Sequence, residues 1–134
     1  MHPSLKKFSL SSHYRLKSSK ALSSLYKEGR TFSLYPLRVY YAVVEKNNDE
    51  SILKCAFSVP KRIYKKAVDR NRLKRQMREA LRLNKGILLV PDPGQSVHLL
   101  IMYFSNEKLK YQIIEKAMKR ILKRLVKEVA QSDA

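Results

Sequence analysis

The residues best suited to chemistry in this chain are the cations of residues 61–85, which read KRIYKKAVDRNRLKRQMREALRLNK. Eleven of these residues are Lys or Arg, and only Asp69 and Glu79 are acidic. Some of the cations recur at intervals of four residues, and a helix would place them in one row. This row consists of Arg70, Lys74, Arg78 and Arg82. It suits a partner with regularly spaced negative charges, as a nucleic-acid backbone has.

The composition of the whole chain favours the same partner. The 134 residues include 29 Lys+Arg and 11 Asp+Glu, which gives a formal net charge of +18. Self-repulsion of this size disfavours a compact fold, so solubility alone explains the charge poorly. A membrane-surface helix would carry large apolar residues opposite its charges, and the basic segment has no such Trp or Phe face. We therefore expect nucleic acid as the partner, no membrane, and no evident protein partner.

The sequence lacks the side-chain arrangements of a self-sufficient nuclease. Its three histidines, His2, His13 and His98, are far apart, and its carboxylates form no compact cluster for two metal ions. The single cysteine, Cys55, lies in an apolar stretch and can form no disulfide within the chain. We therefore predict no catalytic residue, no metal site in the protein, and a cytoplasmic location.

The helices that position these residues are predicted from apolar periodicity. The basic helix should run over 67–84, with its buried face repeating every three to four residues and Gly86 ending it. That face consists of Leu73, Met77, Ala80 and Leu81. A shorter helix is predicted over 18–28, with Gly29 in the left-handed position that ends many helices. A four-residue apolar repeat predicts the last helix over 106–130.

The strands are predicted from β-branched and apolar runs. Residues 37–45 and 52–59 should form two strands, paired as a hairpin, with Pro60 ending the second. Residues 97–104 are almost continuously apolar, which is typical of a central strand. The strands before and after the basic helix are interpreted as a βαβ unit. The predicted class is therefore α+β, a two-layer α/β sandwich with one sheet.

The predicted organisation is one RNA-binding domain over 15–130, with a flexible basic arm over 1–14 and a tail over 131–134. One helix layer would leave the other face of the sheet partly open. Tyr26 and Tyr40 either line a groove on that face, where aromatic rings stack on unpaired bases, or serve as core residues with exposed hydroxyl groups. The pattern alone leaves both interpretations open.

The segment FSVPKRIYKKAVDRNRLKRQMREALR resembles the signature of the bacterial ribonuclease P protein component, an apolar strand ending in S-V-S-K-K followed by A-V-x-R-N-R-x-K-R-x-x-R-E. Residues 15–32 resemble the opening of that family, and residues 98–125 fit its final strand and helix. The sequence departs from the pattern at Leu22 and Tyr26, where the family usually has two phenylalanines. Pro60 stands where the family usually has Ser.

The resemblance implies an α-β-β-β-α-β-α fold with a left-handed crossover around the Arg-Asn-Arg helix, and so a further strand near 30–36. It implies the protein subunit of a ribonucleoprotein that removes the 5′ leader of precursor transfer RNA by endonucleolytic hydrolysis. The partners would be ribonuclease P RNA and precursor transfer RNA. Catalysis would reside in the RNA, and the Mg²⁺ cofactor would be held mainly by the RNA and the substrate.

The resemblance also assigns residues to two surfaces. It places the following residues against the catalytic RNA: Lys61, Arg70, Asn71, Arg72, Lys74, Arg75 and Arg78. It places a second set along the leader: Leu22, Tyr26, Tyr40, Ser58 and Arg62. Lys61 lies between the two sets and is able to serve either surface.

Two other classes of function compete with this interpretation. A ribosomal-type or RNA-chaperone protein with no role in cleavage has the same composition and fold class, and only the register of the motif argues against it. A DNA-binding regulator would need two close helices in a helix-turn-helix, whereas strands are predicted on both sides of the basic helix.

Overall fold

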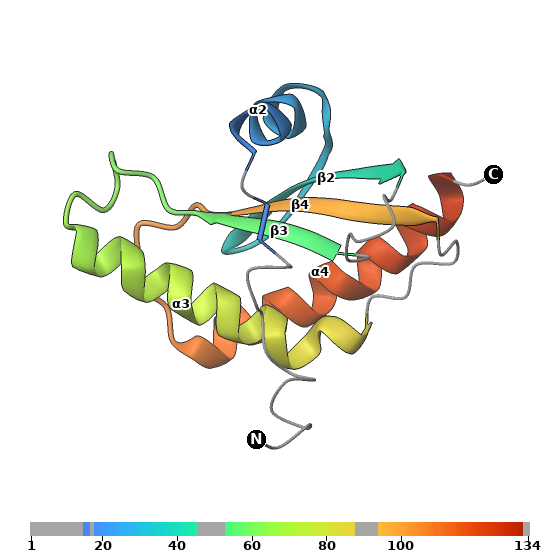
Figure 1. The fold of residues 1–134 in the computed structure, drawn as a ribbon. Coiled ribbons are helices and arrows are strands. Elements are labelled where there is room, and N and C mark those ends of the chain that lie inside the picture. The colour runs from blue at the N-terminus through green and yellow to red at the C-terminus, as the bar shows by residue number, and fades with distance from the viewer. Residues whose placement is uncertain (1–14, 17, 46–52, 88–93, 133–134) are drawn as a thin grey trace, which may run out of the picture.

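The computed structural model describes residues 15–16, 18–45, 53–87 and 94–132. The elements follow one another along the chain as in Figure 1: α2 (Ser19–Glu28), β1 (Arg30–Leu34), β2 (Leu37–Glu45), β3 (Leu53–Ser58), α3 (Ala67–Asn84), the 3₁₀ turn η2 (Lys85–Ile87), β4 (Gln95–Tyr103) and α4 (Tyr111–Ser132). The predicted α+β class with a single sheet is confirmed, and β1 is the strand expected near 30–36. The predicted flexible arm over 1–14 lies outside the described residues.

The sheet has the strand order β1-β2-β4-β3. β1 and β2 pair antiparallel, as do β2 and β4, whereas β3 runs parallel to β4. The predicted hairpin of 37–45 with 52–59 is therefore wrong, because β4 lies between those two strands. Since β3 and β4 are parallel neighbours joined through α3, the predicted βαβ unit is confirmed.

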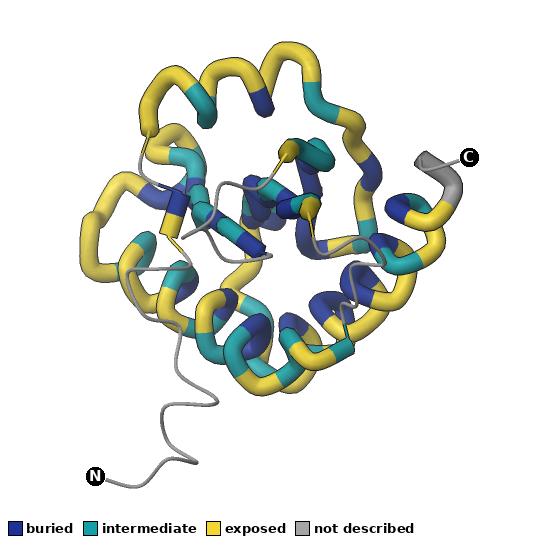
Figure 2. The backbone as a smooth tube through the Cα atoms, turned by 45° about the vertical axis from the view of Figure 1, so that its right-hand side comes forward, coloured by how far each residue is buried: buried dark blue, intermediate teal, exposed yellow. Residues whose placement is uncertain are grey.

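The two faces of the sheet carry cores of different size. α3 and α4 lie side by side under one face (Figure 1) and enclose the main core, which includes Leu99, Ile101 and Met77 with no exposed surface. α2 crosses the opposite face and covers a small cluster made by Leu16, Leu25, Tyr40 and Leu100. Figure 2 shows buried residues on the inner sides of the helices and exposed residues on the outer sides. The second face is thus partly covered by one short helix.

α3 has the predicted bounds, because its apolar residues recur on one side of the helix and pack against the sheet. Leu73, Met77, Ala80 and Leu81 are its buried residues. β3 ends at Ser58, as expected from Pro60. The remaining expectations about helix ends need correction.

Gly29 does not adopt the left-handed conformation. Its φ of −66° and ψ of 153° are extended and lead directly into β1. A Cβ atom at this position would collide with the carbonyl oxygen of Leu25 and lie 3.1 Å from that of Tyr41. Close approach of the backbone, rather than a positive φ, therefore favours glycine here.

The place of Gly86 and the start of α4 also differ from the prediction. α3 stops at Asn84, and Gly86 lies within the 3₁₀ turn with no positive φ. α4 begins at Tyr111 instead of residue 106, because side chains hold the preceding segment in a turn. The hydroxyl of Tyr103 donates to the carbonyl oxygen of Glu107 and accepts from the backbone N–H of Leu109 at 3.1 Å. The helix then continues to Ser132, into the predicted tail.

Candidate nucleic-acid interface

The first candidate surface is the outer side of α3, opposite its buried residues. Asn71, Arg72, Arg75 and Arg78 are exposed there, and Lys74 is half-buried. The guanidinium carbon of Arg78 lies 6.0 Å from the centre of the Phe57 ring, which orients that side chain towards β3. Within the described residues, no carboxylate lies within 4.0 Å of a charged nitrogen of this set. The set is therefore able to bind external anions.

Two cations of the predicted four-residue row are engaged by the protein itself. Arg70 donates from Nη1 to the carbonyl oxygens of Tyr64 and Lys65, both at 2.9 Å, and so fastens the loop before α3 to the first turn of the helix. Arg82 binds Glu79 through Nε at 2.9 Å and through Nη2. This contact lowers the pKa of Glu79 and raises that of Arg82.

The two acidic residues of the basic segment have structural partners. Glu79 pairs with Arg82, and Asp69 accepts from Nζ of Lys108 at 3.0 Å, which ties the first turn of α3 to the segment before α4. Both carboxylates are thus engaged by cations of the protein itself. Among contacts between described residues, Arg70 is the member of the predicted RNA-binding set on α3 that donates side-chain hydrogen bonds within the protein.

The second candidate surface is the sheet face that α2 partly covers, and four of the five predicted leader residues are placed there. The rings of Tyr26 and Tyr40 have their centres 5.1 Å apart at an interplanar angle of 41°. Leu22 is half-buried against the small cluster. Ser58 faces the same side, because Cys55, an odd number of residues away on β3, is buried in the main core.

The exposure of the two tyrosines separates their roles. The side chain of Tyr26 is 56% exposed, whereas Tyr40 is only 9% exposed and belongs to the small cluster. Tyr40 therefore acts partly as a core residue that supports the ring of Tyr26. The core interpretation thus fits Tyr40, whereas base stacking by Tyr26 stays a prediction.

The predicted cations near this groove lie in the turn after β3. Lys61 and Arg62 are exposed and follow Ser58 by three and four residues. Backbone bonds from the N–H groups of Ile63 and Tyr64 to the carbonyl oxygen of Pro60 hold this turn. Burial raises the pKa of Tyr64 to about 12, and its hydroxyl donates to the carbonyl oxygen of Ser105 at 2.9 Å. This anchored turn connects the groove to the start of α3.

The prediction missed Arg38 as a residue of the same face. Sheet register places Arg38 beside Met102, and Met102 beside Ser58, in one row across β2, β4 and β3. Arg38 donates from Nε to Oγ of Ser33 at 3.2 Å and lies 5.8 Å from the centre of the Phe104 ring. The signal was present in the sequence, because Arg38 precedes Tyr40 by two positions and so shares its face in any strand.

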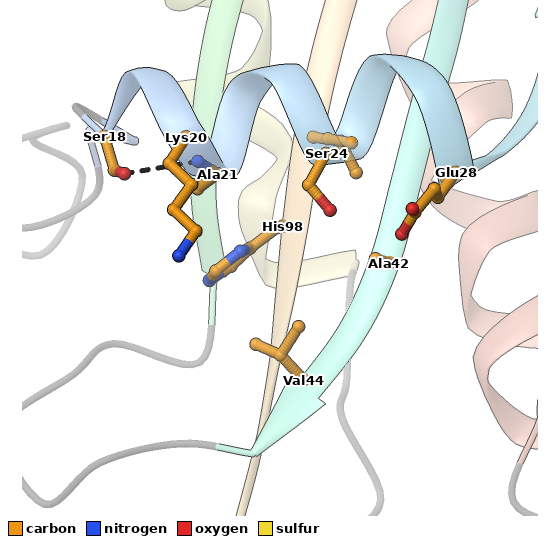
Figure 3. A pocket seen from close by; sticks show the side chains of 10 residues that line it. Ser18, Lys20, Ala21, Ser24, Glu28, Ala42, Val44 and His98 are labelled. Atoms are coloured by element: carbon orange, nitrogen blue, oxygen red, sulfur yellow. Dashed lines mark hydrogen bonds between the residues drawn. The ribbon is translucent and has the colours of Figure 1, made fainter.

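On the other side of α2, a cavity of about 490 Å³ separates the helix from the ends of β2 and β4. Figure 3 shows Ser24 and Glu28 above it, with Val44 and His98 below. Ser24 follows Leu22 by two helical positions, so it lies on the opposite side of α2 from the groove. No predicted site residue lines this cavity.

The described residues contain no group of three or more His, Cys, Asp or Glu side chains placed to hold a metal ion. Cys55 is buried, and burial raises the pKa of its thiol to about 12. None of the helices in the described segments is both long and apolar enough to cross a membrane. The two basic and aromatic surfaces are thus the chemically distinctive parts of the structure described.

Comparisons with known proteins identify the family of this chain. A family model described as Ribonuclease P matches residues 10–126. The ribonuclease P protein component of Porphyromonas gingivalis is 34% identical over 127 residues, covering 93% of this chain and 92% of that protein. The corresponding protein of Clostridium kluyveri is 32% identical over 111 residues, covering 83% and 93%.

Solved structures show the same fold. The RNase P protein of Staphylococcus aureus matches with a TM-score of 0.65 at 22% identity, covering 84% of this chain and 94% of that one. The RNase P protein from Thermotoga maritima matches with a TM-score of 0.64 at 22% identity, covering 82% and 96%. The family match over residues 10–126, together with a match over nearly the full length of curated relatives, shows that this chain belongs to the ribonuclease P protein component family.

Proposed function

We propose that this chain binds ribonuclease P RNA through the exposed cations of α3 and binds the 5′ leader of precursor transfer RNA in the groove beside α2. Family membership makes it the protein component of an RNase P that acts in transfer RNA processing. The ribosomal-type alternative is set aside by that membership. A DNA-binding helix-turn-helix does not fit a basic helix that connects two parallel strands.

The RNA-binding proposal rests on one observation, which is that some cations of α3 bind groups of the protein while others are exposed and unpaired within the described segments. Arg70 forms hydrogen bonds to carbonyl groups of the loop before the helix. Arg72 and Arg75 are exposed, and within the described segments neither forms an ion pair with a carboxylate. The buried face of α3 fixes the position of these cations on the core. Each phosphate that they neutralise releases counterions from the RNA, which supplies affinity without reading sequence.

The groove has the chemistry to hold a single strand. The exposed ring of Tyr26 provides a face on which a base stacks, and Tyr40 supports it from below. Ser58 lies on the same face and Arg62 lies in the turn that follows it, and a hydroxyl and a guanidinium suit the phosphates of the strand. Leu22 provides only an apolar wall, because it has no ring. Lys61 lies in the turn between the groove and α3.

The protein's contribution to catalysis would be positioning and charge screening. We propose that the RNA subunit performs the hydrolysis with Mg²⁺ held by RNA and substrate phosphates, while this chain holds the leader and neutralises repulsion between the two RNAs. The proposed place of action is the cytoplasm. This chain would then lower the Mg²⁺ concentration that the holoenzyme needs.

Reconstitution tests this proposal. The RNA-free protein, a bacterial ribonuclease P RNA transcribed in vitro, and their mixture are each incubated with precursor transfer RNA labelled at its 5′ end, over a Mg²⁺ titration. We expect no leader release by the protein alone and a lower half-saturating Mg²⁺ concentration for the mixture than for the RNA alone. Leader release by the RNA-free protein, or an unchanged Mg²⁺ requirement, would contradict the proposal.

A further inference from the structure

A second row of cations lies on α4, outside both surfaces assigned above. Its members recur at intervals of three and four residues, so they share one side of the helix. This α4 cation row consists of Lys116, Arg120, Lys123 and Lys127, all of them exposed. At 1.5 Å per residue the row extends over roughly 16 Å.

The α4 cation row faces away from the sheet. The opposite side of the helix is buried in the main core through residues that include Ile114, Met118, Ile121 and Leu125, all with no exposed surface. α3 packs beside α4 on the same sheet face (Figure 1). Arg72 and Arg75 are exposed on α3, and the α4 cation row is exposed on the side of α4 that faces away from the core. The helix layer therefore presents basic residues from both of its helices.

The acidic residues of α4 are used elsewhere. Glu115 lies 4.0 Å from Nζ of Lys119 and accepts from the hydroxyl of Tyr111 at 3.3 Å. Glu128 lies 3.5 Å from Arg124 and accepts from the hydroxyl of Tyr41 at 2.9 Å, which directs it towards β2. In the part of the chain that the structure describes, no carboxylate lies within 4.0 Å of the row's nitrogens.

This arrangement is unfavourable for the isolated protein. Neighbours of like charge three or four residues apart on a helix destabilise it by about 0.2–0.5 kcal/mol per pair, and the row contains three such pairs. A face that serves only solubility usually mixes charges of both signs. A row of one sign, with the acids of the same helix turned to its flanks, indicates an anionic partner.

The side chains of the row also indicate which part of an RNA they suit. Residues 116–127 contain no aromatic side chain, so the row has no platform for unpaired bases. Ile113 is the only exposed large apolar residue on α4 in the described part, which leaves no apolar face for a membrane. Lys and Arg without such partners bind the phosphate backbone, irrespective of sequence.

We propose that the α4 cation row is a second phosphate-binding surface that holds a double-helical segment of the same RNA that α3 binds. This inference rests on the proposed binding of ribonuclease P RNA. Two neighbouring helices of one layer would then contact two places on the RNA, so that the RNA is fixed in orientation as well as position.

The test compares double variants with equal loss of charge. Lys123→Gln with Lys127→Gln removes half of the row, and Lys20→Gln with Lys27→Gln removes two exposed cations from α2, across the sheet. Gln has nearly the helix propensity of Lys, and thermal unfolding checks that both variants fold. Binding to the RNA that reconstitutes cleavage is measured without precursor transfer RNA, over a range of salt concentrations.

We expect the α4 variant to flatten the slope of log K against log salt by about 1.8, since each phosphate contact contributes about 0.9. Its affinity at about 0.15 M salt should fall by more than tenfold, while the α2 variant keeps the slope of the parent.

A third variant, Arg72→Gln with Arg75→Gln, separates the two proposals. If it flattens the slope and the α4 variant does not, the inference is overturned and the proposed function stands. If neither the α3 variant nor the α4 variant changes the slope, both the inference and the proposed binding of RNA by α3 are overturned. An equal effect of the α2 variant would show a general field of charge and overturn the inference.

Discussion

Replacing Tyr26 with Ala is the sharpest test of the leader groove. The ring of Tyr26 is 56% exposed and stands 5.1 Å from that of Tyr40, so its removal opens the groove without emptying the core. The folded protein should lose little stability, because the large effects of truncation, about 2–5 kcal/mol, belong to fully buried side chains. The consequence should therefore be seen in binding.

The expected size follows from stacking. One base on one aromatic ring contributes about 1–3 kcal/mol. Because each loss of about 1.4 kcal/mol in binding free energy raises the dissociation constant tenfold, the variant should bind precursor transfer RNA roughly 5- to 150-fold more weakly. Mature transfer RNA has no leader, so its affinity should change little. Tyr26→Phe keeps the ring and should retain the affinity of the parent for both RNAs.

The assay measures dissociation constants of the reconstituted holoenzyme, with a precursor whose scissile phosphodiester is blocked against hydrolysis and with mature transfer RNA. Equal losses for the two RNAs would refute the reasoning, because the ring would then act on the fold or on the RNA subunit. A loss in Tyr26→Phe as large as in Tyr26→Ala would assign the effect to the hydroxyl. Tyr40→Ala should also weaken precursor binding, but it is a less direct test, because Tyr40 is only 9% exposed.

Further predictions concern stability, salt dependence and reactivity. Met77→Ala should lower the free energy of unfolding by about 2–5 kcal/mol in a denaturant titration, since Met77 has no exposed surface; a change below about 1 kcal/mol would contradict its place in the core. Arg75→Ala should leave stability within about 0.5 kcal/mol and flatten the salt slope of RNA binding by about 0.9. Arg70→Ala should instead destabilise the protein by about 1–3 kcal/mol, since it loses charged bonds to two carbonyl groups; equal stability of the two Arg variants would count against this distinction. Cys55 should resist iodoacetamide at about pH 8 and react only in denaturant, because burial raises the pKa of its thiol to about 12 and the reactive thiolate is therefore scarce. Mass spectrometry measures the labelling, and rapid labelling of the native protein would contradict this prediction.

α3 is predictable from its sequence for a simple physical reason. The spacing of Leu73, Met77, Ala80 and Leu81 is set by one helix against one sheet, so a local pattern determines both the bounds and the inward face. The same holds for the end of β3 before Pro60, which lacks the N–H that a ladder requires. Features that depend on a single element were therefore predicted well.

Features that depend on distant partners were predicted less well. β2 and β3 follow each other in the sequence, and only the position of β4 between them shows that they do not pair. Similarly, the start of α4 is delayed by the hydroxyl of Tyr103, and Arg70 binds the carbonyl groups of Tyr64 and Lys65 in the loop before α3. No periodicity encodes such contacts, because they join segments that meet only in the folded chain.

The shallow attachment of α2 has a consequence for how the protein handles different leaders. Leu25 is the only buried residue of this helix, and the cluster beneath it is separate from the main core. Local opening of α2 should therefore require far less free energy than global unfolding, and its amide protons should exchange earlier than those of α3 and β4. One wall of the groove is thus the rigid sheet, and the other is a helix able to shift as a unit. Such a groove can adjust its width to a purine or a pyrimidine while the cations of α3 keep their positions.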